Sequence, residues 1–109
     1  MARVRRGGEG RDVAWSETFK AMGDRTRLSI LLRIMQSEQC VTDIGKALKM
    51  DAPKVSFHLT RLKYAGLVTQ ERRGQRVMYR INPDVAEEAD SGTSLSIDGC
   101  VITFSKGSR

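Results

Sequence analysis

The sequence has few of the residues from which disulfides, metal sites and membrane spans are built. Its 109 residues include two cysteines, one histidine, two prolines and only 6% aromatic residues. Cys40 and Cys100 stand far apart, so they do not make the disulfide framework of a small secreted domain. The lone histidine, His58, has no ligand partners at usable spacing, so we expect no metal site. No apolar run approaches the length of a transmembrane helix, so we expect no membrane contact.

The residue patterns of common enzymes are also absent from the sequence. Ser56 and His58 stand two apart on one expected helix, so they point in different directions and do not form a nucleophile–base pair. No glycine-rich phosphate loop and no box of paired carboxylates appears. We therefore predict a protein that is not an enzyme and holds no cofactor. The arginine-rich start lacks the apolar segment of a signal peptide, which predicts a cytoplasmic protein.

Positive charge is abundant and unevenly placed. The chain has a net charge of +6 and a pI near 9.8. Residues 51–82 carry +5, whereas residues 83–109 carry −3. A basic segment without an amphipathic basic helix favours a nucleic-acid partner over a membrane surface. With 39% hydrophobic residues, the chain fits one small globular domain with one core.

Residues 41–66 predict two short helices joined by a tight turn. Apolar residues recur at three- and four-residue intervals in the first helix and again in the second, which we place at residues 52–65. Asp51 is a suitable N-cap for the second helix, and Pro53 falls in its first turn. Gly66 is expected to end this helix. The arrangement is typical of a helix-turn-helix whose second helix enters the DNA major groove.

We expect the DNA contacts to come from the polar faces of these two helices. The groove-facing set of the second helix is Lys54, Ser56, Phe57, Thr60 and Arg61. Thr42 and Lys46 on the first helix are expected to contact phosphates. His58 lies between the polar and apolar sides of its helix, so either a packed or a phosphate-touching imidazole fits it.

After Gly66 the hydrophobic period changes from that of a helix to that of a strand. Residues 67–72 and 76–81 are two β-prone runs around Arg73-Gly74-Gln75, which predicts a hairpin. Its tip carries Arg72, Arg73, Gln75 and Arg76, a concentration of charge that suits a wing laid along a phosphate backbone.

The N-terminal part divides into an arm and two helices. Residues 1–14 read as a flexible basic arm, either solvated or reaching DNA. Ser16 is expected to cap a helix over residues 17–22, where Trp15, Phe19 and Met22 share one face. This face is expected to belong to the core and to a subunit contact. Asp24 is expected to cap a central helix over residues 25–36.

The C-terminal part is expected to add a second hairpin beyond the domain of residues 15–82. Residues 83–93 read as an acidic linker. In residues 94–104 the apolar parity shifts at Asp98-Gly99, and a two-residue turn there pairs Ile97 with Cys100. The same turn pairs Leu95 with Ile102, so these residues and Phe104 share one apolar face. The face is expected to pack on the core or on another subunit.

Four ordered motifs resemble the ArsR family of bacterial repressors. They are residues 19–31 (Phe-Lys-Ala-Met-Gly-Asp-Arg-Thr-Arg-Leu-Ser-Ile-Leu), residues 38–44 (Glu-Gln-Cys-Val-Thr-Asp-Ile), residues 55–68 (Val-Ser-Phe-His-Leu-Thr-Arg-Leu-Lys-Tyr-Ala-Gly-Leu-Val) and residues 77–81 (Val-Met-Tyr-Arg-Ile). The resemblance implies an α+β winged helix-turn-helix of four helices and a hairpin wing. It also implies a homodimer that binds an inverted-repeat operator in double-stranded DNA and represses transcription until an inducer releases it.

The chain departs from the family pattern at three places. Arg25 replaces the proline that usually follows Asp24. The family's metal-binding Cys-x-Cys is Cys40-Val41-Thr42 here, and one thiolate does not make a soft-metal site. The C-terminal dimerisation helix of many relatives has no counterpart, and the apolar hairpin stands in its place. The expected dimer contact therefore involves Trp15, Phe19, Met22, Leu95, Ile97, Ile102 and Phe104.

Two alternatives remain open from the sequence. Cys40 and Cys100 are either buried thiols or a redox pair that rearranges the recognition helices. The basic face could also serve an acidic protein partner, which would make the chain a protein-interaction module. The grouping of Arg61 and the wing arginines beside base-reading candidates favours DNA.

Overall fold

The computed structural model describes the backbone of residues 9–89, 92–97 and 100–104, and side chains within residues 16–86, 94–96 and 101–104. The helices are α1 (Glu9–Met22), α2 (Arg25–Gln36), α3 (Val41–Leu48) and α4 (Ala52–Tyr64). The strands are β1 (Gln39–Cys40), β2 (Val68–Arg73), β3 (Arg76–Ile81), β4 (Ala86–Ala89), β5 (Gly92–Ile97) and β6 (Cys100–Phe104).

The caps of α2 and α4 are those the sequence predicts. Asp24 accepts a hydrogen bond from the Arg27 amide at 2.9 Å, and Asp51 accepts one from the Lys54 amide at 3.2 Å. Each carboxylate satisfies a free N–H in the first turn of its helix. Gly66 follows α4 with φ 81° and Lys49 ends α3 with φ 57°, so both chain reversals use the left-handed conformation. Only the first of these residues is a glycine.

Helix α1 is longer than predicted. It begins at Glu9, so residues 9–14 of the predicted flexible arm are helical and Ser16 lies inside the helix instead of capping it. Extending an existing helix fixes one residue for each hydrogen bond gained, which makes growth from residues 16–22 towards the N-terminus inexpensive.

The wing is part of a three-stranded antiparallel sheet with strand order β1-β3-β2. Strands β2 and β3 form the predicted hairpin, in which Arg73 pairs with Arg76. Strand β1, whose Gln39 and Cys40 pair with Tyr79 and Met78, was not predicted from the sequence. A strand of two residues has too little periodicity to reveal itself, and its pairing partner lies about 40 residues further along the chain.

A second antiparallel sheet, with order β4-β5-β6, follows the wing. The predicted hairpin register is confirmed, since Ile97 pairs with Cys100 and Leu95 with Ile102. The predicted linker of residues 83–93 is wrong in part, because residues 86–89 form β4 along the free edge of β5. Alanine and glutamate have low β-propensity, but an unpaired edge offers a full row of backbone partners that outweighs it.

The hydrophobic core joins the helices to both sheets. Its fully buried side chains are Ile30, Leu31, Ile44, Leu59, Leu62, Leu67, Leu95, Val55 and Val68. Leu95 anchors the C-terminal sheet in this core, and Ile102 and Phe104 pack beside it. The sheet therefore packs on the core of its own protomer.

Two residues of the predicted dimer contact belong to this core instead. Met22 and Leu95 are buried within one chain, so neither offers surface to a second copy. Phe19 is half-buried against the same core. The side chains of Trp15, Ile97 and Cys100 lie outside the described ones.

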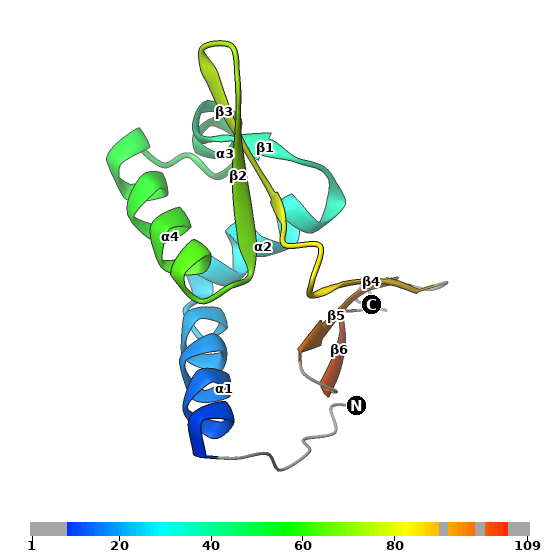
Figure 1. Ribbon diagram of the computed structural model, residues 1–109. Helices are drawn as coiled ribbons and strands as arrows, with labels where there is room; N and C mark the ends of the chain where they lie inside the picture. Colours follow the sequence, from blue (N-terminus) through cyan, green and yellow to red (C-terminus); the bar gives the residue numbers. More distant parts are fainter. Residues whose placement is uncertain (1–8, 90–91, 98–99, 105–109) are drawn as a thin grey trace, which may run out of the picture.

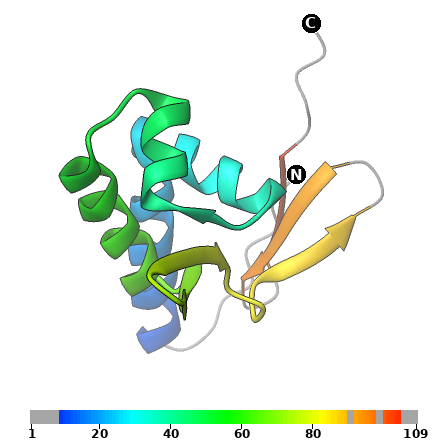
Figure 2. The same cartoon turned by 90° about the horizontal axis from the view of Figure 1, so that it is seen from above.

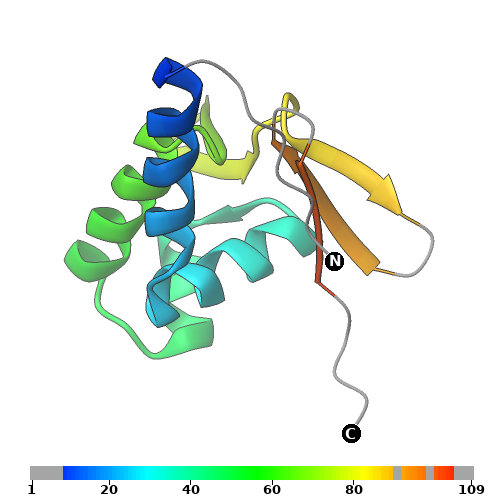
Figure 3. The ribbon, with the colours of Figure 1, turned by 90° about the horizontal axis from the view of Figure 1, so that it is seen from below.

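The elements leave one side of the molecule free of the C-terminal sheet. In Figure 1 the wing rises above the helices, α4 lies on one flank and β4–β6 lie on the other. Views from above and below show the same separation (Figures 2 and 3). The outward face of α4 and the wing are thus unobstructed by the added sheet.

Gly45, inside α3, is a site where alanine is expected to destabilise the fold. A Cβ there would lie 2.8 Å from the Met50 carbonyl oxygen, and the Met50 amide already bonds to the Gly45 carbonyl at 2.9 Å. We expect Gly45→Ala to lower the free energy of unfolding by about 1–3 kcal/mol, measured by urea denaturation. A helical glycine-to-alanine change ordinarily stabilises by about 0.5–1 kcal/mol. An unchanged or higher stability would therefore contradict the contact.

Candidate nucleic-acid interface

Helix α4 divides sharply into a buried and an exposed side. Its buried residues are Val55, His58, Leu59 and Leu62. Its exposed residues from the second turn onward are Ser56, Phe57, Thr60, Arg61, Lys63 and Tyr64, and Lys54 is exposed in the first turn. The spacing of 3.6 residues places Phe57 and Thr60 near the middle of the exposed side. This side combines hydroxyl groups, cations and two aromatic rings.

Phe57 and Arg61 form a stacked pair on this exposed side. The guanidinium carbon of Arg61 lies 5.2 Å from the centre of the Phe57 ring. Phe57 is 54% exposed although it is a large apolar residue. A cation over an aromatic face is held by the ring's quadrupole, which limits the conformations open to the arginine.

His58 is packed under α4 and does not belong to the exposed surface. The residue is 9% exposed, and its Nδ1 lies 3.4 Å from Nη1 of Arg27 in α2. Arg27 also donates from Nε to the Ala21 carbonyl at 2.9 Å, so one side chain joins the end of α1 to α4. Of the two alternatives that the sequence left open for His58, the packed imidazole is the one observed, and its placement among the DNA contacts is wrong because the residue is buried between helices. Burial holds the pKa of His58 below the ordinary 6.5, and Asp24 opposes that shift.

The lowered pKa of His58 predicts a loss of stability on acidification. A group whose folded pKa lies below its unfolded pKa takes up a proton on unfolding, so stability falls as pH drops below about 6.5. The slope for this one proton is at most about 1.4 kcal/mol per pH unit. Urea denaturation between pH 7 and 5 should show the slope in the wild type and a flatter curve in His58→Gln.

Two carboxylates, Asp24 and Asp43, set the lower pH limit of this test, because their own titration also changes the free energy of unfolding. The Arg27 amide lowers the pKa of Asp24, and the Cys40 thiol lowers that of Asp43, both from an ordinary 3.8. Their contributions are present above that value and are lost only as pH falls through it. A wild-type stability that rises between pH 7 and 5 would contradict the buried, neutral His58.

The wing arginines differ in what they contact. Arg73 pairs with Glu38 at 2.8 Å and with Glu71 at 2.9 Å. Arg76 lies 3.8 Å from Asp43 and 3.5 Å from the Cys40 sulfur. Within the described part of the chain, Arg72 has no ion-pair partner. The structure thus gives two of the three tip arginines partners within the protein, whereas the exposed Arg72 has no ion pair among the described residues.

The remaining predicted phosphate contacts lie on exposed surface. Thr42 and Lys46 are exposed on α3, and Gln75 is exposed at the wing turn. The structure therefore places every predicted DNA contact except His58 on exposed surface.

Cys40 is a buried thiol at the start of α3. It is 5% exposed, and its Sγ donates to Oδ2 of Asp43 at 3.1 Å. No group of three or more histidine, cysteine or acidic residues that could hold a metal occurs among the described residues. Because Thr42 supplies a hydroxyl in place of a second thiolate, these residues do not fit a soft-metal site. Cys100, the predicted redox partner of Cys40, has a side chain outside the described ones.

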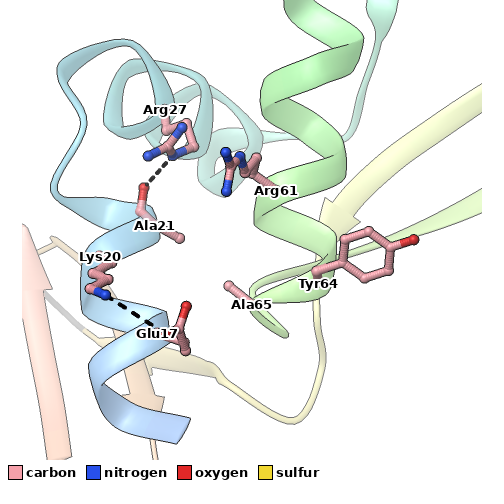
Figure 4. Close-up of a pocket in the computed structure, with 7 residues that line it drawn as sticks. All are labelled: Glu17, Lys20, Ala21, Arg27, Arg61, Tyr64 and Ala65. Carbon is pink, nitrogen blue, oxygen red and sulfur yellow. Dashed lines mark hydrogen bonds and ion pairs between the residues drawn. The ribbon is translucent and has the colours of Figure 1, made fainter. Parts of the chain in front are cut away.

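A cationic cleft lies between α1 and the end of α4 (Figure 4). It has a volume of about 490 Å³ and is lined by Glu17, Lys20, Ala21, Arg27, Arg61, Tyr64 and Ala65. Lys20 pairs with Glu17 at 3.9 Å, whereas Arg27 and Arg61 reach into the same end of the cleft. Arg27 was not predicted from the sequence, because its contacts with Ala21 and His58 arise only when three helices pack together.

Within the part of the chain that the structure describes, no helix is both long and apolar enough to cross a bilayer.

Comparison with known proteins places these features in a family. The family model described as "Bacterial regulatory protein, arsR family" matches residues 24–70. The arsenical resistance operon repressor of Bacillus subtilis is 33% identical over 94 residues, which cover 85% of each chain. The arsenic resistance transcriptional regulator ArsR1 of Pseudomonas putida is 39% identical over 74 residues, covering 67% of this chain. That match covers 58% of the Pseudomonas protein, so the chain spans less than two thirds of this relative's length.

A solved structure shares the fold. It is the homodimeric winged helix-turn-helix DNA-binding domain of Mb0332 from Mycobacterium bovis, with a TM-score of 0.64 and 30% identity. The superposition covers 73% of this chain and 76% of that domain. The α+β winged helix-turn-helix prediction is thereby confirmed.

Proposed function

The chain belongs to the ArsR family of bacterial regulatory proteins, and on that premise we propose that it is a homodimeric, DNA-binding repressor of transcription acting in the cytoplasm. Helix α4 enters the major groove and the wing follows the adjacent phosphate backbone. The observation that carries this proposal is the exposed side of α4, where donors and hydroxyls stand clear of the core.

The proposed contacts divide into base-facing and phosphate-facing groups. Lys54, Ser56, Phe57, Thr60 and Arg61 face the bases, because they share the exposed side of α4. The phosphate-facing group sets the register of the protein on the duplex and consists of Thr42, Lys46, Arg72, Arg73, Gln75 and Arg76. The net charge of +5 over residues 51–82 supplies the attraction on which such contacts depend.

The dimer is needed because one α4 reads only half of an inverted repeat. Two copies of α4 must lie about 34–36 Å apart to enter successive major grooves on one side of the duplex. We propose that Trp15 and Phe19 of α1 contribute to the contact, together with Ile97, Ile102 and Phe104 of the C-terminal sheet. The inverted-repeat operator follows from the two-fold symmetry of this dimer.

Fluorescence anisotropy tests the proposal directly. The purified protein is titrated against duplex DNA from upstream of its own gene and against a scrambled duplex, over a salt series. Selective binding that persists at physiological salt is expected. Weak binding of equal strength to every sequence would contradict the operator and favour an acidic protein partner. Sedimentation of the complex measures whether two protomers bind each site.

Repeating the titration with mild oxidant tests the predicted redox pair. Loss of binding under oxidant in the wild type, but not in a Cys40→Ser/Cys100→Ser variant, would support a sensing role. A double variant that still responds to oxidant would remove it. The buried position of Cys40 makes slow reaction with a thiol reagent the expected behaviour of the free protein.

The two neighbouring wing arginines should differ in their contribution to DNA binding. Arg72→Ala is expected to weaken binding to all sequences and to reduce the slope of log K against log salt by about one, because one phosphate contact is lost. Arg73→Ala is its matched control, since Glu38 and Glu71 already engage that guanidinium. Its slope should change less. A larger change for Arg73→Ala than for Arg72→Ala would show that the ion pairs open on DNA.

A further inference from the structure

Helix α4 carries an exposed apolar ring, that of Phe57, on the side that we propose faces the DNA bases. Phe57 is 54% exposed and lies near the middle of the outward side of α4. Most residues around it on this side are polar, and the two apolar or aromatic ones, Pro53 one turn earlier and Tyr64 two turns later, are themselves exposed. An exposed phenylalanine contributes nothing to the core, whereas an apolar side chain in the major groove can contact the methyl group of thymine.

The second observation is what lies on the ring. Arg61, one turn further along, stacks its guanidinium over Phe57 with 5.2 Å between the guanidinium carbon and the ring centre. The ring of His58 contacts the ring of Phe57 edge-on, with the two ring centroids 5.3 Å apart. Phe57 is therefore held by a buried neighbour below it and holds a cation beside it. A planar guanidinium restrained in this way is suited to bidentate contact with guanine O6 and N7.

We propose that Phe57 and Arg61 act as one base-reading unit, with Phe57 on the C5 methyl of a thymine and Arg61 on a guanine at a neighbouring base pair. This inference rests on the proposed DNA-binding function and names what the recognition helix selects. Thymine and guanine should accordingly adjoin in each half-site. Lys54 and Thr60, which lack an aromatic partner, then serve as secondary contacts on either side of the pair.

Chemical deletion in the DNA tests each half of the unit. The half-site is first obtained by selecting duplexes from a random library with the wild-type protein. Each thymine is then replaced by deoxyuridine, which removes only the C5 methyl group. Each half-site should contain one thymine that Phe57 contacts. Replacing this thymine in one half-site should weaken binding of the wild type about fourfold, which corresponds to the free energy of burying one methyl group. Replacing that thymine in both half-sites should cost about 16-fold, because separated positions act independently.

Protein variants assign the methyl contact to Phe57. Phe57→Ala should bind the thymine and deoxyuridine duplexes with equal affinity. Tyr64→Ala is the matched control, because Tyr64 is an exposed aromatic residue on the same side of α4 and should keep the fourfold difference. The exposed position of Phe57 means that Phe57→Ala should fold with wild-type stability, which urea denaturation checks.

The arginine half is tested in the same way. Replacing the neighbouring guanine by 7-deazaguanine removes the N7 acceptor and should weaken the wild type about fivefold. Arg61→Ala should not distinguish guanine from 7-deazaguanine. Phe57→Ala should reduce this discrimination, because Arg61 loses the ring on which it rests.

The outcomes separate this inference from the function on which it rests. Sequence-selective binding in which no deoxyuridine substitution weakens the complex would overturn the inference and leave the repressor proposal intact. A methyl effect that persists in Phe57→Ala would assign the contact to another residue and also overturn it. Failure to select any sequence would remove both proposals.

Discussion

Replacing Leu59 by alanine is expected to lower the free energy of unfolding by about 2–5 kcal/mol. Leu59 is fully buried on the inner side of α4 among the core residues that join the helices to the sheets. The change removes buried apolar atoms and leaves a cavity that close-packed neighbours fill only in part. Because a domain of this size is stable by only about 5–15 kcal/mol, the loss should shift the urea midpoint strongly.

The adjacent residue supplies the control for Leu59→Ala. Thr60 is exposed on the opposite side of the same helix, so Thr60→Ala should change stability by no more than about 0.5 kcal/mol. Its effect should appear instead in sequence-selective DNA binding. Leu59→Ala should thus change mainly the stability of the fold, whereas Thr60→Ala should change mainly DNA binding. If Thr60→Ala unfolded the protein, or Leu59→Ala left its stability unchanged, the orientation assigned to α4 would be incorrect.

Leu95→Asp is expected to detach the C-terminal sheet. Leu95 has no exposed surface and, among the described side chains of β5, is the one that belongs to the hydrophobic core. Aspartate there would lose the apolar contacts and bury a carboxylate without a partner, at a cost of about 4 kcal/mol or more. Leu95→Met, which nearly conserves volume, should cost less than about 1.5 kcal/mol.

Hydrogen exchange would show how far the damage from Leu95→Asp extends. If the sheet is a separate cooperative unit, the amides of β4–β6 should lose protection while those of α2–α4 keep it. Uniform loss in all elements would show that the sheet and the helices unfold together. Protection of β5 equal to that of the wild type would contradict the burial of Leu95.

The features that the sequence predicted correctly depend on chemistry within a few residues. Asp24 and Asp51 cap their helices because a carboxylate beside free amides has a strong local preference. The C-terminal hairpin register followed from the parity of Leu95 and Ile102, because side chains alternate between the faces of a strand. The exposed side of α4 followed from the helical period in the same way.

The features that were missed depend on partners distant in the sequence. β4 forms because β5 presents an unpaired edge, although residues 86–89 have little β-propensity of their own. His58 looked equally suited to either side of α4, and its burial against Arg27 became visible only with the helices packed. The division of the wing arginines has the same origin, since Glu38 stands far from Arg73 in the chain. Local pattern located the exposed side of α4 and the wing tip, but long-range contacts decided which side chains there remain exposed and unpaired among the described residues.

The strand order β1-β3-β2 has a mechanical consequence for the helix-turn-helix. β1 enters α3 directly and β2 follows α4, and both strands pair with β3. The two ends of the helix-turn-helix are therefore fastened to one strand, which closes it into a hydrogen-bonded ring. Such a ring resists shear between α4 and the wing, so the protein has a preset span between them. In a complex with DNA we expect the protein to deform less than the duplex. A duplex whose groove spacing does not match the distance between α4 and the wing should therefore bend to fit the protein.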